Sequence, residues 1–201
     1  MHLIRLEYHF KALRRLVPKI VASVPEAVFY LFRHNPKAGA VEGLCGTGFL
    51  VLRPSIRPNG TPHAYGVTNW HVAMSAGASI IRVNTRNGKS RFIEYGPEEW
   101  HSPSNGDDLA VIDVSEKLDL VLDDVTGLYE DIFITPEAIK AFSIGIGEDA
   151  FMCGLFASHH GGERNVPVAR FGNLSMMATD AAPVDLATGK RLACFLMVTC
   201  H

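Results

Sequence analysis

From Val24 onward the chain consists of short apolar runs separated by glycine, proline and asparagine. Apolar runs of this length, bounded by turn-forming residues, predict an all-β protein rather than alternating strands and helices. The candidate strands of the first part lie at residues 26–33, 45–53, 64–69, 79–85, 89–95 and 109–114. Because these strands are enough to close one antiparallel barrel, we expect residues 24–114 to form a complete barrel.

The loops between these strands favour antiparallel pairing. Residues 53–63 are rich in proline and glycine, and Asn87-Gly88 is a strong signal for a two-residue hairpin turn. Residues 115–147 then break the pattern and contain Thr135 and Pro136, a cap and a first-turn proline that predict a short helix at 135–142. We expect this segment to connect two barrels.

Strands resume at residues 149–156, 166–177 and 191–199, which places a second unit at residues 148–201. Three strands cannot close a barrel, so the second barrel is expected to be incomplete. The last apolar run continues to the C-terminus without a polar turn, and open apolar edges invite aggregation. We therefore expect the sequence to be a truncated piece of a longer protein.

The first part of the chain, residues 1–23, is a basic amphipathic segment. Its apolar residues recur at helical spacing with arginine and lysine between them, which predicts an N-terminal helix ending near Pro18. Contact of residues 1–20 with a membrane surface is one interpretation, and a helix docked on the domain or an ill-ordered leader is the other. No apolar stretch is long enough for the core of a signal peptide or for a transmembrane span.

Composition narrows the partners and the compartment. The chain has 21 acidic and 19 basic residues, which gives a net charge of −2. A chain with this charge is not expected to bind nucleic acid. The four cysteines, at positions 45, 153, 194 and 200, lack the spacing of zinc ligands. We interpret them as free thiols of a reducing compartment, and hence expect a cytoplasmic protein.

Candidate chemistry centres on His71 and Asp108. His71 follows the strand at 64–69, and Asp108 directly precedes the strand at 109–114. A histidine whose ring nitrogen meets an aspartate is held in one tautomer and becomes a better general base. Taken singly, a histidine at a strand end is usually structural, and an aspartate before a strand is usually a solvated turn residue; Asp107 is expected to be such a surface charge.

Three segments resemble the motifs of trypsin-like serine peptidases of the bacterial type. They are Gly46-Thr47-Gly48-Phe49, Thr68-Asn69-Trp70-His71-Val72 and Asp108-Leu109-Ala110-Val111. The resemblance extends over residues 25–201, since 151–156 and 165–177 resemble strands of the second barrel. It implies a double β-barrel, a serine endopeptidase acting on a peptide or protein substrate without a cofactor or metal, and His71 as general base with Asp108 as its orienting partner.

The nucleophile of that family is missing from the sequence. No Gly-x-Ser-Gly-x-Pro string or near variant occurs in the 201 residues, so we expect this chain to be inactive by itself. Three hypotheses remain open: an endopeptidase fragment, a pseudo-peptidase that binds proteins or peptides, and an interaction domain whose histidine motif is coincidental. The residues that would set the cleavage preference follow the nucleophile in the family, so the sequence gives no substrate.

Other candidates are weaker. His159 and His160 are adjacent and converge poorly on one metal ion, with no third ligand placed by the sequence. The glycines of Gly145-Ile146-Gly147 imitate the start of a dinucleotide fingerprint but lead into a strand, so a turn explains them better. Ser175 is the one serine that we consider as a substitute nucleophile, but it lies in the middle of a predicted strand.

Overall fold

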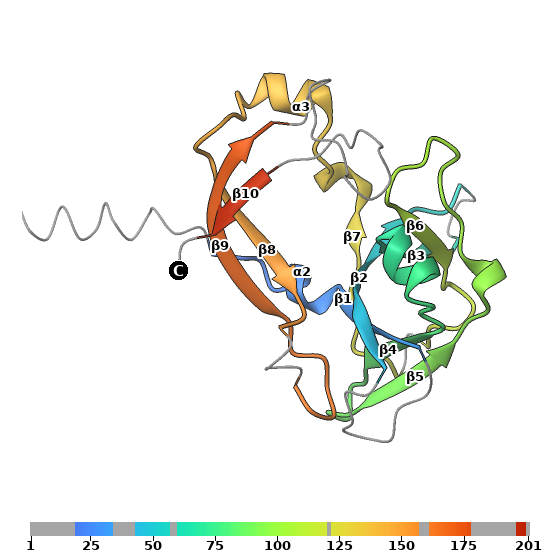
Figure 1. Ribbon diagram of the computed structural model, residues 1–201. Helices are drawn as coiled ribbons and strands as arrows, with labels where there is room; N and C mark the ends of the chain where they lie inside the picture. The colour runs from blue at the N-terminus through green and yellow to red at the C-terminus, as the bar shows by residue number, and fades with distance from the viewer. Residues whose placement is uncertain are drawn as a thin grey trace, which may run out of the picture.

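The computed structural model describes residues 19–33, 43–56, 60–119, 122–156, 161–177 and, for the backbone alone, 196–199. Strands dominate it and the helices are short, so the protein is all-β (Figure 1). Its elements are α2 (Ser23–Glu26), β1 (Val28–Phe32), β2 (Leu44–Arg53), β3 (His63–Thr68), η1 (His71–Ser75), β4 (Ile80–Asn84), β5 (Ser90–Glu94), η2 (Pro97–Glu99), β6 (Ala110–Asp113), β7 (Leu128–Tyr129), η3 (Glu130–Ile132), α3 (Pro136–Ala141), β8 (Asp149–Gly154), β9 (Val168–Met176) and β10 (Leu196–Thr199).

Strands β1 to β6 form one sheet in the order β5-β4-β1-β2-β3-β6, in which all neighbours are antiparallel. The six strands expected within residues 26–114 all form, with ends that differ by about two residues or fewer, a shift within the ordinary scatter of strand boundaries. The short strand β7 pairs with β2 in parallel, a contact that no pattern in the sequence indicates.

Strand β1 is buried on both faces. Phe29 and Leu31 face the main core, whereas Tyr30 and Phe32 face a second, smaller cluster with Ile80. Leu155, which follows β8, packs against this smaller cluster and so covers the outer side of β1. The main core is completed by Leu50, Ala64, Val72, Ala73, Ala78, Ile81, Val83, Ile93, Tyr95, Trp100, Ala110, Ile112 and Val114.

The expected closure of the first barrel does not occur among the described strands. The sheet has two edges, β5 and β6, which do not pair with each other. After β5 the chain turns through η2, and His101 takes the outer edge of β6 in an isolated bridge with Val111. Two hydrogen bonds of 2.8 Å join the backbones of His101 and Val111, so a loop residue occupies the edge that closure requires.

A second antiparallel sheet has the order β10-β9-β8 and lies beside the first (Figure 1). Strands β8 and β9 lie where the sequence predicts strands, at 149–156 and 166–177. Of the strand expected at 191–199, the structure describes Leu196–Thr199 as β10, and residues 191–195 lie outside the described residues. The connection contains α3 where a short helix is predicted, and the Thr135 hydroxyl accepts a hydrogen bond from the Ala138 amide at 3.2 Å. Gly145 and Gly147 lie in the turn region that leads into β8, not at the start of a helix.

The loop before β9 is fastened to β4 by buried side chains. Arg82 on β4 is only 1% exposed. Its guanidinium donates to Asn165 Oδ1 at 2.7 Å and to the carbonyl of Gly162 at 2.9 Å. The Asn165 amide group in turn donates to the Arg82 carbonyl at 2.6 Å. Because Arg82 and Asn165 are 83 positions apart, this contact joins the first sheet to the segment that carries the second.

The predicted N-terminal amphipathic helix ends near Pro18, and residues 1–18 lie outside the described residues. The first described helix is α2, a single turn with no buried residue. Within the described ranges, no helix is long and apolar enough to cross a membrane.

Candidate active site

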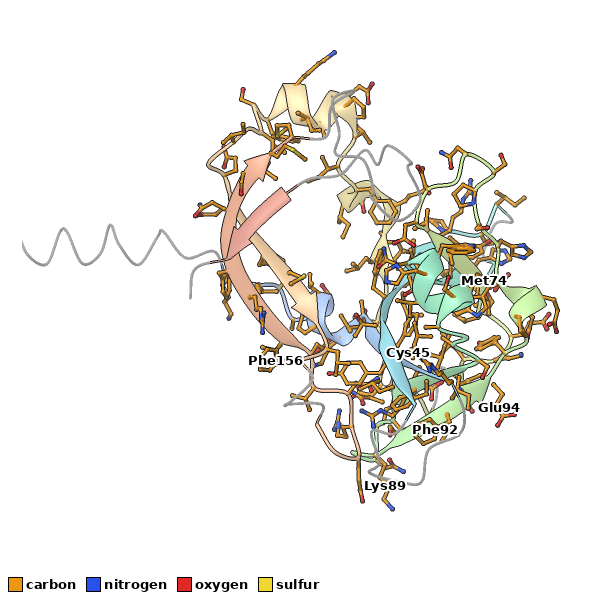
Figure 2. All side chains as sticks on the ribbon, viewed as in Figure 1. Cys45, Met74, Lys89, Phe92, Glu94 and Phe156 are labelled. Atoms are coloured by element: carbon orange, nitrogen blue, oxygen red, sulfur yellow. The ribbon has the colours of Figure 1, made fainter. Side chains whose placement is uncertain are left out.

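The chain between β3 and η1 places His71. Thr68 ends β3 and is buried, and its hydroxyl donates to the Thr47 carbonyl on β2 at 2.7 Å. The Asn69 carbonyl then accepts the amides of Val72 and Ala73, both at 3.1 Å, and starts a π-helical turn. Val72 and Ala73 are buried, which anchors the turn and leaves His71 at its exposed beginning. Exposed Met74 lies on the same turn (Figure 2).

Strand pairing brings Asp108 to the same place. Strand β6 runs antiparallel to β3, with Ala110 opposite Thr68. The residues just before Ala110 and just after Thr68 therefore lie at one end of the strand pair. Two positions before Ala110 is Asp108, and one position after Thr68 is Asn69, so residues far apart in the sequence become neighbours.

The Asp108 carboxylate accepts three hydrogen bonds from this turn. The His71 ring lies with Nδ1 2.6 Å from Asp108 Oδ2, and the His71 backbone amide donates to Oδ1 at 2.9 Å. Asn69 Nδ2 donates to Oδ2 at 3.1 Å and also to the Asp108 carbonyl at 3.2 Å. The ring distance lies in the range of about 2.6 to 3.2 Å that a base and its orienting partner need.

The electrostatics of Asp108 favour its charged form. Burial raises the pKa of its carboxyl, but the hydrogen bonds from the His71 amide, the His71 ring and Asn69 outweigh burial and hold the pKa below its usual value. At neutral pH the group is thus a carboxylate, which can accept a hydrogen bond from a protonated Nδ1. In the neutral tautomer that carries its proton on Nδ1, the lone pair is on Nε2.

The neighbouring Asp107 takes no part in this arrangement. Its carboxylate accepts a hydrogen bond from Asn105 Nδ2 at 2.8 Å, and its backbone amide donates to Asn105 Oδ1 at 3.1 Å. It is exposed, as the sequence predicts for a surface charge. Of the two adjacent carboxylates, the geometry therefore selects Asp108 as the partner of His71.

The His71 side chain is 63% exposed, whereas that of Asp108 is 34% exposed. Among the described residues, no hydroxyl or thiol forms a hydrogen bond with the His71 ring. Ser175 lies in β9, and its hydroxyl donates to the Asn173 carbonyl at 3.3 Å, two residues away. The structure thus brings together the two predicted site residues and does not bring Ser175 to them.

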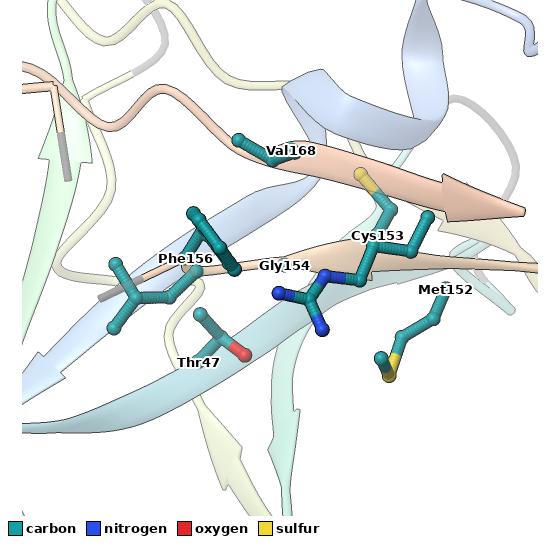
Figure 3. A pocket seen from close by; sticks show the side chains of 8 residues that line it. Thr47, Met152, Cys153, Gly154, Phe156 and Val168 are labelled. Atoms are coloured by element: carbon teal, nitrogen blue, oxygen red, sulfur yellow. The ribbon is translucent and has the colours of Figure 1, made fainter. Parts of the chain in front are cut away.

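A groove between the two sheets starts beside this pair. One pocket of about 230 Å³ is lined by Asn69 and Leu109 at the site and extends to Thr47 and Cys153. A second pocket of about 220 Å³ shares Thr47 and Cys153 and continues along β8 and β9 (Figure 3). Its remaining lining is Met152, Gly154, Leu155, Phe156, Val168 and Arg170.

Neither a reactive thiol nor a metal-binding cluster is found among the described residues. Cys45 and Cys153 are free, and burial raises the pKa of both thiols, which disfavours the reactive thiolate. Cys194, Cys200, His159 and His160 lie outside the described residues. Within the described ranges, no group of three histidine, cysteine, aspartate or glutamate side chains could hold a metal ion.

Asn69 is a functional candidate that the analysis of the sequence did not single out. It belongs to the Thr68-Asn69-Trp70-His71-Val72 motif, but only the fold shows that its amide reaches Asp108.

The comparisons with known proteins add no family to this geometry: no protein-family model matches the chain, and no curated protein matches it.

Proposed function

We propose that the chain is part of a trypsin-like serine endopeptidase domain in which His71 is the general base and Asp108 its orienting partner. The observation that carries the proposal is the contact of 2.6 Å between His71 Nδ1 and Asp108 Oδ2, combined with the His71 amide bond to the other carboxylate oxygen. The two bonds fix both the carboxylate and the ring. A histidine with an incidental role does not require both.

In this mechanism Asp108 keeps the ring proton on Nδ1, so that Nε2 can take the proton of an attacking hydroxyl. The hydroxyl oxygen then forms the bond to the substrate carbonyl carbon, and the carbonyl electrons move to its oxygen. Protonated His71 returns the proton to the leaving amine as the peptide bond breaks. Asp108 stabilises the positive ring between these two steps.

The fold supports a double barrel as the finer architecture of this proposal. The two sheets lie beside each other (Figure 1). The groove between them begins at Asn69 and Leu109, which are neighbours of the site residues in the sequence. The bridge between His101 and Val111 brings the chain that leaves β5 to the outer edge of β6, which supports a first barrel completed by a loop residue and not by pairing of β5 with β6. The three strands β8 to β10 are the incomplete second barrel of the proposal.

A second candidate function is a pseudo-peptidase that binds an extended peptide. Within the described residues no nucleophile contacts His71, whereas the groove is present and reaches the exposed Arg170. Among the described strands, β8 has β9 as its single neighbour, and a free strand edge can pair with a peptide. In this function His71 and Asp108 stabilise one end of the groove.

A fluorophosphonate probe, which labels activated serines covalently, tests the first candidate. The 201-residue chain should remain unlabelled, and a chain extended by the codons that follow His201 through a Gly-x-Ser-Gly motif should be labelled. The His71→Ala variant of the extended chain should lose labelling. His101→Ala is the matched control, since His101 is also exposed and its hydrogen bonds to Val111 are made by the backbone, and it should keep labelling.

Two outcomes would contradict the proposal. Labelling of the short chain would reveal a nucleophile elsewhere, with Ser175 the first residue to mutate. A folded, extended chain that is not labelled, or that keeps its label in His71→Ala, would favour the peptide-binding function.

A further inference from the structure

The turn before His71 makes a contact with Asp108 that a base and its partner do not require. Asn69 Nδ2 carries two hydrogens, and it donates to two acceptors on the same residue: the carboxylate oxygen Oδ2 at 3.1 Å and the backbone carbonyl at 3.2 Å. A donor that bridges the side chain and main chain of one residue restricts the rotation of that side chain. It also supplies the Oδ2 atom with a second hydrogen bond beside the one from the His71 ring.

We propose that Asn69 is a positioning residue for the pair: its amide clamps the Asp108 carboxylate in the orientation in which Oδ2 faces the His71 ring. The catalytic meaning of this clamp rests on the proposed function, but the clamp itself does not. Asn69 touches neither a substrate nor the His71 ring in any contact that the structure describes, and it acts through Asp108.

The clamp is necessary because the site is open to solvent. Asp108 is about one-third exposed and Asn69 is exposed, so water competes for the carboxylate oxygens. The His71 backbone amide occupies Oδ1, which leaves Oδ2 for the ring. Without Asn69 a water molecule can take its place on Oδ2 but cannot tie that oxygen to the Asp108 carbonyl in the same way, so the carboxylate gains freedom to rotate.

The backbone of Asn69 has a separate task, which the test must leave intact. Its carbonyl accepts the amides of Val72 and Ala73, and these bonds hold the turn whatever the side chain is. Asn69→Leu has nearly the shape of asparagine without the donor. Asn69→Asp keeps the shape, replaces the donor by an acceptor and adds a charge beside Asp108, and Asn69→Gln restores an amide on a longer chain.

The test is a pH titration of the Asp108 carboxyl carbon by NMR in the 201-residue protein. In Asn69→Leu the pKa of Asp108 should rise towards that of an ordinary aspartate, in Asn69→Asp it should rise further, and Asn69→Gln should recover part of the wild-type value. The groups that face Asp108 are His71 and Asn69.

Asn105→Leu is the matched control. Asn105 donates to Asp107 Oδ2 at 2.8 Å in the same loop, so its loss should leave the titration of Asp108 unchanged. An Asn69 side chain that only supports the fold would lower the melting temperature of Asn69→Leu without moving the Asp108 titration, and that result would overturn the proposal. An unchanged Asp108 titration in a fully stable Asn69→Leu would overturn it as well.

In an active, extended chain, Asn69→Leu should lower kcat about tenfold with little change in KM, because a misplaced carboxylate weakens the base and not substrate binding. This arm separates the two proposals. If His71→Ala keeps fluorophosphonate labelling while Asn69→Leu shifts the Asp108 titration, the clamp stands and the peptidase function falls. If His71→Ala abolishes labelling and the titration does not move, the reverse holds.

Discussion

Asp108 is a half-buried carboxylate whose three donors all come from the short segment Asn69 to His71. The donors favour its charged form, so its pKa in the folded protein lies below the value of about 3.9 that an unfolded chain has. A carboxyl with a lowered folded-state pKa stabilises the fold above its unfolded pKa. That contribution is lost as the pH falls through the folded pKa.

The first prediction concerns acid stability. The wild type should unfold at a higher urea concentration than Asp108→Asn, and the difference between the two midpoints should be largest near neutral pH. The difference should shrink as the pH falls from about 5 towards 2, because the protonated carboxyl resembles the amide. Glu99 also has a lowered pKa, through hydrogen bonds from Gly96 and Lys117, but it is present in both proteins and cancels. Two parallel curves over this pH range would show that Asp108 is not the group responsible.

At the scale of single residues, the sequence could predict the places of His71 and Asp108 but not the role of Asn69. Strand ends are visible as the limits of apolar runs, and antiparallel pairing brings such ends together. An asparagine that follows a strand is often an ordinary turn residue without a contact to a carboxylate. Whether its amide points to solvent or to a carboxylate depends on the register of Thr68 opposite Ala110, which no local pattern specifies.

At the scale of elements, the glycines of β2 explain why this strand can lie so close to its neighbours. A Cβ at Gly46 would lie 3.0 Å from Val72 Cγ1, on the turn that carries His71. A Cβ at Gly48 would lie 2.3 Å from Phe29 Cζ and 2.5 Å from the Val67 carbonyl oxygen. The second of these atoms belongs to the backbone of β3 and cannot rotate away.

The second prediction follows from this contact. Gly48→Ala should reduce the free energy of unfolding by about 3 kcal/mol, because the added methyl group pushes both Phe29 and the backbone of β3 away from β2. Gly145→Ala is the matched control, because nothing lies within 4 Å of a Cβ at that position, and it should change stability by less than about 0.5 kcal/mol. The free energies of unfolding of both variants are measured by urea unfolding, with fluorescence as the readout. Similar decreases in the free energy of unfolding in both variants would refute the packing argument.

The strands were predictable and the closure of their sheet was not. Apolar runs and turn residues define each strand locally, which is why β1 to β6 and β8 to β10 lie where the pattern indicates. Which edges meet depends on contacts between distant segments. The single bridge of His101 to Val111 and the two residues of β7 are too short to leave a pattern in the sequence.

At the scale of the whole molecule, Arg82 and Asn165 hold the segment of the second sheet against the first. Arg82 occupies a strand position where a charge would be expected to face solvent, yet it is 1% exposed and lies over the rings of Tyr30 and Phe32. Its burial is possible because a loop far along the chain supplies acceptors. The sequence shows the charge but not the distant residues that surround it.

The third prediction is that Asn165→Leu destabilises the protein by about 3 kcal/mol, because it removes one acceptor of a buried guanidinium and the amide that donates to the Arg82 carbonyl. Backbone amides of β8 and β9 should also exchange hydrogen faster relative to those of β2 and β3. Asn173→Leu is the control, because Asn173 is exposed on β9 and bonds only within its own sheet region, to Gly147 and Asp149. Equal losses in the two variants would show that the buried contact has no special weight.

The distance along the chain between Arg82 and Asn165 also has a consequence for the order of events on the ribosome. Strands β1 to β6 have been synthesised when translation reaches residue 114. The acceptors at Gly162, Arg164 and Asn165 follow about fifty residues later, which takes some seconds at ordinary rates of synthesis. Until then the guanidinium lacks these three carbonyl and amide acceptors, so β4 cannot reach the packing that it has in the folded protein. The first sheet thus reaches its final packing only after translation has passed the loop before β9.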